Sequence, residues 1–295
     1  MRHPFAVALV LALAACSHRP PALGAPDGGG LAPAEDPSAQ LEFRVDGRTV
    51  RILTLGELTA LIGPETVENF DGYYHRTKRF RALRLDRVLA EAFGGAVREP
   101  LRTRQFVLRA RDGYTVPIAG ERLLEAGAFL AIRDLDRPGW EPIGPQRANP
   151  GPAYLIWREP SQVDLETHPR PWQLAVIEIA RFEAVFPHTA PTGEPEGSLA
   201  RRGYAIFTDL CIRCHAINRE GGRVGPELNV PQNITEYRPE AQIRAYIRNP
   251  LTFRYSAMPA HPNLGDGDLD GLVAYLRAMA QRKHDPDARP DGGTP

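Results

Sequence analysis

The cysteines of this 295-residue chain are few and unevenly placed, and two of them restrict how the surrounding region can fold. Cys16 stands near the start, whereas Cys211 and Cys214 are two residues apart and are followed directly by His215. Two thiols on one helical turn lie on the same face, where each can add to a vinyl group of a haem, and the next imidazole can bind the iron. The spacing therefore predicts one covalently attached haem c.

Two other interpretations of the same spacing need surroundings that the sequence lacks. A zinc half-site would need a second Cys/His pair, and the chain offers none. A thioredoxin-like dithiol would need a βαβ setting, and no such pattern surrounds residues 211–215. Haem attachment is the interpretation that these residues favour.

The N-terminus has the features of an export signal. A short basic start precedes an apolar run over residues 5–15, far shorter than the ~20 residues that a membrane-spanning helix needs. The run ends in Leu-Ala-Ala-Cys at Cys16, which resembles the lipobox of bacterial lipoproteins. This resemblance implies removal of residues 1–15, lipidation of Cys16 and, because Ser17 is not the Asp of a retention signal, the periplasmic side of an outer membrane. The alternative is an ordinary cleaved signal in which Cys16 has no role.

Composition divides the rest of the chain into domains and connecting segments. The 36 basic and 36 acidic residues cancel, which argues against a nucleic-acid-binding protein. Glycine, proline and polar residues without an apolar period fill residues 16–40, 189–197 and 284–295, which we interpret as a tether, a linker and a disordered tail. These segments leave one domain over residues 41–188 and a second over residues 198–283.

Residues 41–188 have the alternation and turn residues of short strands. Asp-Gly pairs that begin at Asp46, Asp71 and Asp112 separate alternating apolar runs and predict three hairpins. Thr54 and Glu57 have the form of a capping box that opens a short helix. Residues 85–92 have helical spacing. Residues 128–132, 153–157 and 174–179 are apolar runs that are long enough only for buried strands. An α+β domain with mainly antiparallel strands is predicted.

Residues 198–283 have helical periods and no convincing strand. Apolar positions recur at helical spacing in three segments, at residues 199–207, 243–247 and 272–280. A helical domain of this small size needs help to build a stable core, and a large apolar cofactor would supply it.

A haem iron in this domain needs a sixth ligand, and the chain has only three methionines. Met1 would leave with the signal, and Met279 lies among apolar positions of the predicted last helix. Met258 stands in a proline-stiffened loop, so we expect His215 and Met258 to bind the iron, with His261 as the alternative to Met258. A His/Met pair raises the reduction potential relative to two histidines and suits an electron carrier.

The helical region resembles the class I cytochromes c. The resemblance rests on the 211–215 motif, on Gly203 and Phe207 of the first helix opposite Tyr275 of the last, and on the Gly-Pro-Glu-Leu loop that contains Pro226. It implies an all-α cytochrome c fold with one haem, in which the carbonyl of Pro226 orients the haem-binding imidazole.

Charge is distributed unevenly between the two domains. Residues 198–283 contain twelve basic and eight acidic residues, a net charge of +4, and the rest of the chain carries −4. We hypothesise that some of these bases surround the exposed haem edge and steer an acidic redox partner protein. A solvated surface with no docking role is the alternative.

Residues 41–188 resemble the molybdopterin-binding domain of the sulfite oxidase type in residues 74–89, 111–114, 129–132 and 144–147. In that family a cysteine thiolate anchors the metal, and here no cysteine stands between Cys16 and Cys211. We therefore expect a domain without molybdopterin that serves for docking or ligand sensing. The alternative is a retained pterin or anion site that would use Arg76, Lys78, Arg79 or Arg147.

Together these features predict a lipid-anchored, periplasm-facing monohaem cytochrome c that carries single electrons between partner proteins. One alternative is an enzyme whose first domain oxidises a small substrate and passes electrons to the haem, and another is a redox-sensing module. Substrate-dependent haem reduction by the isolated protein would favour the enzyme, whereas reduction only in the presence of a partner would favour the carrier.

Overall fold

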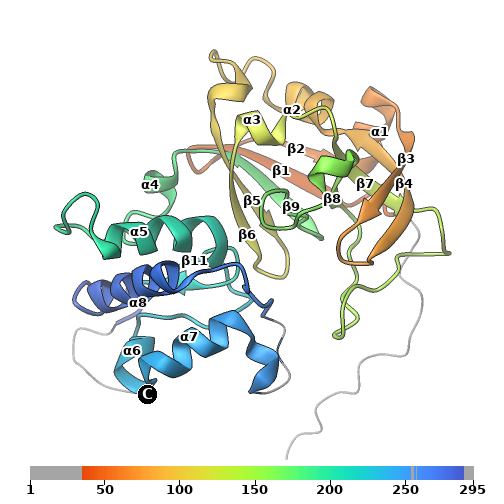
Figure 1. The fold of residues 1–295 in the computed structure, drawn as a ribbon. Coiled ribbons are helices and arrows are strands. Elements are labelled where there is room, and N and C mark those ends of the chain that lie inside the picture. The colour runs from red at the N-terminus through yellow and green to blue at the C-terminus, as the bar shows by residue number, and fades with distance from the viewer. Residues whose placement is uncertain (1–34, 254–255, 257, 289–295) are drawn as a thin grey trace, which may run out of the picture. The chain divides into compact units, whose positions relative to one another are not determined.

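The computed structural model describes residues 35–253, 256 and 258–288 (Figure 1). The predicted signal peptide, Cys16 and most of the tether lie outside these residues. All of the described residues belong to one compact unit of the chain. A β-rich region is followed by a helical region, as predicted. No helix within the described residues is both long and apolar enough to cross a membrane.

One sheet of the β-rich region has five strands in the order β2-β1-β9-β5-β6. These are β1 (Gln40–Val45), β2 (Arg48–Thr54), β5 (Gln105–Ala110), β6 (Thr115–Ala119) and β9 (Leu174–Ile179). The β1–β2 and β5–β6 hairpins are confirmed at their Asp-Gly pairs, and Asp46 and Gly47 have the positive φ angles, 47° and 78°, of a tight hairpin turn. Strands β1 and β9 pair in parallel, so this sheet is mixed.

The other sheet of this region has four antiparallel strands in the order β3-β4-β7-β8. These are β3 (Glu65–Asp71), β4 (Arg76–Arg84), β7 (Ala128–Asp134) and β8 (Tyr154–Trp157). The third predicted hairpin is confirmed between β3 and β4, with a loop longer than a two-residue turn. Two of the predicted apolar strands form β7 and β8, and every residue of β8 is buried.

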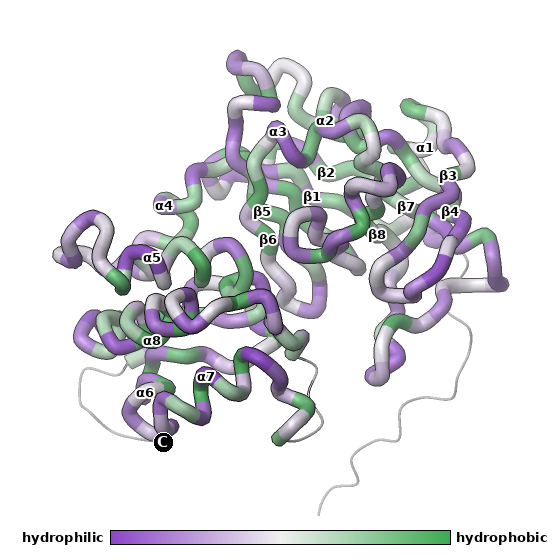
Figure 2. The backbone as a smooth tube through the Cα atoms, viewed as in Figure 1, coloured by the Kyte–Doolittle hydropathy of each residue, from purple (hydrophilic) through white to green (hydrophobic). Residues whose placement is uncertain are grey.

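Helices α1 (Leu55–Ile62) and α2 (Leu85–Phe93) supply apolar faces to the core of this region. The capping box is confirmed, because Glu57 N donates to Thr54 Oγ1 at 3.1 Å and Thr54 N donates to Glu57 Oε2 at 2.7 Å. Phe93 of α2 packs edge to face on Phe43 and Phe106, with ring centroids 5.6 and 6.1 Å apart. Hydrophobic residues are concentrated along β5 (Figure 2). The remaining short helices of the region are α3 (Gly120–Leu123), α4 (Phe182–Val185) and 3₁₀ turns at residues 101–103 and 160–162.

The helical region is built on the crossing of α5 (Leu199–Ile206) with α8 (Asp266–Ala280). A Cβ atom on Gly203 would stand 1.9 Å from the carbonyl oxygen of Gly271, so the two backbones touch. Phe207 packs against Tyr275 with ring centroids 5.1 Å apart, which confirms the predicted contact between first and last helix. The other elements are α6 (Ile234–Tyr237), α7 (Glu240–Arg248) and a 3₁₀ turn at residues 250–252.

Three features of this region were not predicted from the sequence. First, it contains a two-residue ladder between β10 (Ala216–Ile217) and β11 (Glu220–Gly221), where no strand was expected. Second, the linker packs on α8, since Tyr275 Oη donates to the carbonyl of the fully buried Thr189 at 2.8 Å. Third, the first residue of the expected tail, His284, stacks on His188 with ring centroids 3.7 Å apart.

Candidate functional site

The Cys211–Cys214 motif begins where α5 runs into a wider, π-helical turn over Phe207–Cys211. Ile212 N donates to the carbonyl of Phe207 at 2.8 Å, and His215 N donates to that of Cys211 at 2.9 Å, so the chain coils tightly through the motif. Single π-helical turns of this kind are frequent at functional sites. Cys211 and Cys214 are partly exposed free thiols, whereas Ile212 between them is fully buried in the helical core.

The surroundings of both thiols keep them neutral. Burial raises the pKa of Cys211 to about 12 and that of Cys214 to about 11. The protonated thiol is therefore favoured at neutral pH. Two neutral thiols in an apolar setting fit a large apolar group placed against them, as covalent haem attachment requires.

His215 is oriented by the loop that follows the motif. Its Nδ1 donates to the carbonyl of Pro226 at 2.8 Å, which leaves the lone pair of Nε2 available to a metal. A Cβ atom on Gly225 would stand 2.5 Å from the ring of His215, so only glycine lets the loop approach this closely. Burial lowers the pKa of His215, which favours the neutral imidazole that can bind iron. The structure thus brings His215 and Pro226 together in a cradle that fits an iron ligand.

The two candidates for the sixth ligand stand in the loop that follows α7. Met258 N donates to Ser256 Oγ at 3.1 Å, and Tyr246 Oη of α7 donates to the same oxygen at 3.0 Å. His261 N donates to the carbonyl of Ile247, also in α7, at 3.1 Å. Helix α7 therefore holds the backbone at both candidates, and the role of Met258 as iron ligand stays a prediction.

The alternative ligand, His261, is engaged by the β-rich region. Its Nδ1 lies 3.1 Å from Oε1 of Glu166, and its side chain is only 11% exposed. Besides burial, His261 also contributes to the lowered pKa of His215, so the two imidazoles lie within electrostatic range of each other. Sequence reasoning missed Glu166, since nothing in the local pattern around it points to a site.

Arg213, one of the two residues between the cysteines, contacts the β-rich region. Arg213 donates through its guanidinium to the carbonyls of Leu165 and Glu166 at 3.2 and 2.6 Å, and its own carbonyl accepts from Thr115 N at 2.9 Å. A second backbone bond joins Arg223 N to the carbonyl of Gly113 at 3.0 Å. The turn of the β5–β6 hairpin is therefore bonded directly to the cysteine motif.

Two tyrosines of the β-rich region, Tyr73 and Tyr114, lie within electrostatic range of Cys214 and Arg213. Burial raises the pKa values of Tyr73 and Tyr114, the latter to about 12, and the positive charge of Arg213 opposes this rise for both phenols. Tyr73 packs edge to face on Trp172 with ring centroids 5.0 Å apart. These aromatic residues were not among those predicted for the site.

Most basic side chains of the helical region are paired within the described residues. Carboxylates lie within 4.0 Å of seven of them, Arg213, Arg219, Arg244, Arg248, Arg277, Arg282 and Lys283. Arg213 is further directed into the contact with the β-rich region rather than toward solvent. This pairing reduces the local positive field on which the steering hypothesis depends, and steering stays a prediction.

Three of the four basic residues proposed for a pterin or anion site are also paired with carboxylates. Lys78 is fully buried and donates to Asp134 Oδ2 and Glu141 Oε2, both at 2.8 Å. Arg76 pairs with the same Glu141, and Arg79 with Asp136. The fourth residue, Arg147, is exposed in a loop with a positive φ of 55°. Carboxylates of the same domain therefore neutralise most of these positive charges, which disfavours a shared anion pocket.

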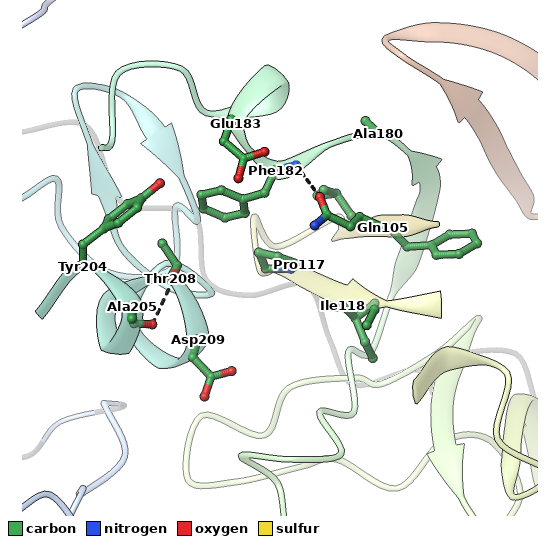
Figure 3. Close-up of a pocket in the computed structure, with 13 residues that line it drawn as sticks. Gln105, Pro117, Ile118, Ala180, Phe182, Glu183, Tyr204, Ala205, Thr208 and Asp209 are labelled. Carbon is green, nitrogen blue, oxygen red and sulfur yellow. Dashed lines mark hydrogen bonds between the residues drawn. The ribbon is translucent and has the colours of Figure 1, made fainter. Parts of the chain in front are cut away.

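A cleft of about 400 Å³ lies between the β5–β6 edge and α5 (Figure 3). Within it Phe182 N donates to Gln105 Oε1 at 2.9 Å and Thr208 Oγ1 donates to the carbonyl of Ala205 at 2.9 Å. Its lining is mixed and includes Pro117, Ile118, Tyr204 and Asp209. None of the predicted site residues lines this cleft.

Comparison with known proteins identifies the helical region. Residues 198–276 match the protein family described as cytochrome C oxidase, cbb3-type, subunit III. The chain is also 32% identical over 117 residues to cytochrome c oxidase subunit 2 of Alkalihalophilus pseudofirmus, a match that covers 37% of this chain. It spans only 34% of that relative. The helical region therefore matches a cytochrome c domain, which implies haem c and suggests electron transfer.

Proposed function

We propose that this chain is a c-type cytochrome that carries single electrons on the periplasmic side of a bacterial outer membrane, anchored there by a lipid on Cys16. The observation that supports this best is the arrangement of two neutral thiols, Cys211 and Cys214, beside an imidazole that Pro226 orients. The match of residues 198–276 to a cytochrome family agrees with this arrangement.

Two pairs of residues would hold the haem, one by covalent attachment and the other by binding the iron. Cys211 and Cys214 would hold it through thioether bonds, and His215 and Met258 would bind the iron from opposite sides. The haem supplies a reversible one-electron couple. Because both axial positions would be filled by side chains, no position is left for a substrate, and transfer through the protein surface is the chemistry that this arrangement supports.

The proposal is tested on full-length protein from a host that attaches haem c. Mass spectrometry of the mature chain should show one haem adduct and a lipid on Cys16, and the reduced-minus-oxidised spectrum should be that of a c-type cytochrome. Replacing both motif cysteines (Cys211→Ala with Cys214→Ala) should abolish the covalent adduct. A colourless wild-type chain from that host would refute the proposal.

A second candidate function is an oxidoreductase whose β-rich domain oxidises a small substrate and passes the electrons to the haem. This domain would have a sulfite oxidase-like fold, either without molybdopterin or with a retained cofactor. It is supported by the direct bonding of Thr115 and Glu166 to the cysteine motif. Haem reduction by a small substrate in the isolated protein, together with stoichiometric molybdenum, would favour it. Reduction only by a partner would favour the carrier, and a respiratory complex is a suitable partner class because both related proteins are named as oxidase subunits.

A further inference from the structure

We infer that Glu166 is a positioning residue of the haem site, which holds His261 aside so that Met258 supplies the sixth ligand. The inference rests on the proposed function and deepens it, because it assigns the choice between two possible iron ligands to a carboxylate of the other domain. It follows from how rigidly Glu166 is held, from what else its loop touches, and from how the loop with Met258 and His261 is anchored.

The loop that carries Glu166 is fixed by its own hydrogen bonds. Asp164 Oδ1 accepts from Glu166 N at 2.9 Å and from Thr167 N at 2.8 Å, and His168 N donates to the carbonyl of Asp164 at 2.9 Å. The backbone bond from Thr167 lowers the pKa of Asp164, so this carboxylate stays charged at neutral pH. His168 is buried, with its Nε2 3.1 Å from Glu125 Oε2. Glu166 is therefore presented from a closed, well-bonded turn.

The same loop contacts both sides of the haem-binding sequence. Its carbonyls at Leu165 and Glu166 accept from Arg213, which stands between the haem cysteines. Its carboxylate reaches His261, three residues beyond Met258. The distance from the cysteine motif to the sixth-ligand loop is thus bridged by two consecutive residues of the β-rich region.

The two possible ligands are anchored in different ways. The backbone of Met258 is held by Ser256 and, through it, by Tyr246 of the cytochrome domain. The ring of His261 is held by Glu166, since its Nδ1–H donates to that carboxylate. Loss of the carboxylate would free the imidazole while the hydrogen bonds at Met258 stay intact. An imidazole that is freed three residues from Met258 and within electrostatic range of His215 would compete with the thioether for the iron. Two histidine ligands lower the reduction potential.

The test uses the full-length, haem-loaded protein with Glu166→Ala, Glu166→Gln and the double variant Glu166→Ala/His261→Ala. We expect Glu166→Ala to lose most of the methionine-to-ferric-iron absorption band and to show a lower reduction potential. Glu166→Gln keeps a side chain that can hydrogen-bond to the ring, so its loss should be smaller. Removal of the competing ring in the double variant should restore both the band and the potential. Glu121→Ala, an exposed carboxylate of α3, is the matched control and should change neither.

Two results would overturn the inference while the proposed function stands. One is a Glu166→Ala protein whose band and potential equal those of the wild type. The other is a loss that removal of His261 does not restore, since that indicates general damage to the site. A wild-type protein with covalent haem but no methionine band would refute both the role of Glu166 and the proposed binding of iron by Met258, while covalent haem attachment would stand. A wild-type chain without covalent haem would refute both proposals.

Discussion

The carboxylate of Glu166 and the imidazole of His261 lie 3.1 Å apart, although 95 positions separate them in the sequence. The contact joins the β-rich domain to the loop of the candidate sixth ligand. The same β-rich segment is also bonded to Arg213, inside the cysteine motif. Substitutions on either side of this contact should therefore change both the unfolding free energy of the chain and the properties of the haem site.

Loss of the Arg213 side chain should destabilise the protein. Its side chain is only 8% exposed, and two carbonyls of the β-rich domain depend on it. Leaving those groups unpaired should cost about 1–3 kcal/mol of unfolding free energy, measured by urea denaturation of haem-loaded Arg213→Ala protein. Arg223→Ala, an exposed arginine whose contact to Gly113 is through the backbone, is the control. Equal stability of both variants would argue against a bonded interface.

Gly225→Ala should disturb the imidazole more than it disturbs the rest of the domain. The added Cβ would stand 2.5 Å from the His215 ring, which the Pro226 bond prevents from moving away freely. We expect a lower yield of covalent haem, and a loss of about 1–3 kcal/mol in the protein that does form. Gly267→Ala, where nothing lies within 4 Å of the new Cβ, should lower neither the yield nor the stability. A Gly225→Ala protein with normal yield and spectrum would contradict the cradle described for His215.

The unmodified thiols should react slowly with alkylating agents. Burial raises the pKa of Cys211 to about 12 and of Cys214 to about 11, so their thiolate fractions rise only as the pH approaches these values. At pH 8 the rate of alkylation in the haem-free chain should be on the order of a hundredfold below that of an ordinary cysteine with a pKa of ~8.5. The same chain in urea is the control and should react at the ordinary rate. Identical rates with and without urea would show that the haem-free motif is not folded as described.

Lys78→Ala should act on stability rather than on anion binding. Lys78 is fully buried, and its removal leaves the buried Asp134 carboxylate without its cation. Breaking a buried pair in this way costs about 3–5 kcal/mol, which thermal or urea unfolding would detect. Arg147→Ala, on an exposed loop, should be neutral. A stable Lys78→Ala protein that has lost affinity for a small anion such as sulfate would instead support the alternative anion site.

Features set by neighbouring residues were predictable from the sequence. The Asp46-Gly47 turn and the Thr54–Glu57 capping box follow from local turn and capping chemistry, and both are present. The contact of Phe207 with Tyr275 was expected from the resemblance to the class I cytochromes c, and it is also present. The parallel pairing of β1 with β9 was not predictable, because alternation fixes which face of a strand is buried and not which strand lies beside it.

In the candidate site, too, residues in local sequence patterns were predictable and a residue distant in sequence was not. Cys211, Cys214, His215 and Pro226 were found because they lie close together in sequence and each belongs to a recognisable pattern. Glu166 stands far from them in the sequence and carries no pattern, so only the folded structure brings it to His261. The lipidation of Cys16 and the binding of iron by Met258 stay predictions.

The backbone bond from Thr115 to Arg213 has a consequence for the order in which the protein matures. Joining a haem to the two cysteines requires access to both thiols and to the peptide segment between them. In the folded protein the β-rich domain already binds this segment through the main chain and the guanidinium of Arg213. Assembly should therefore run in sequence, with the porphyrin installed on a still-separate carboxy-terminal segment and the amino-terminal half closing over it afterwards.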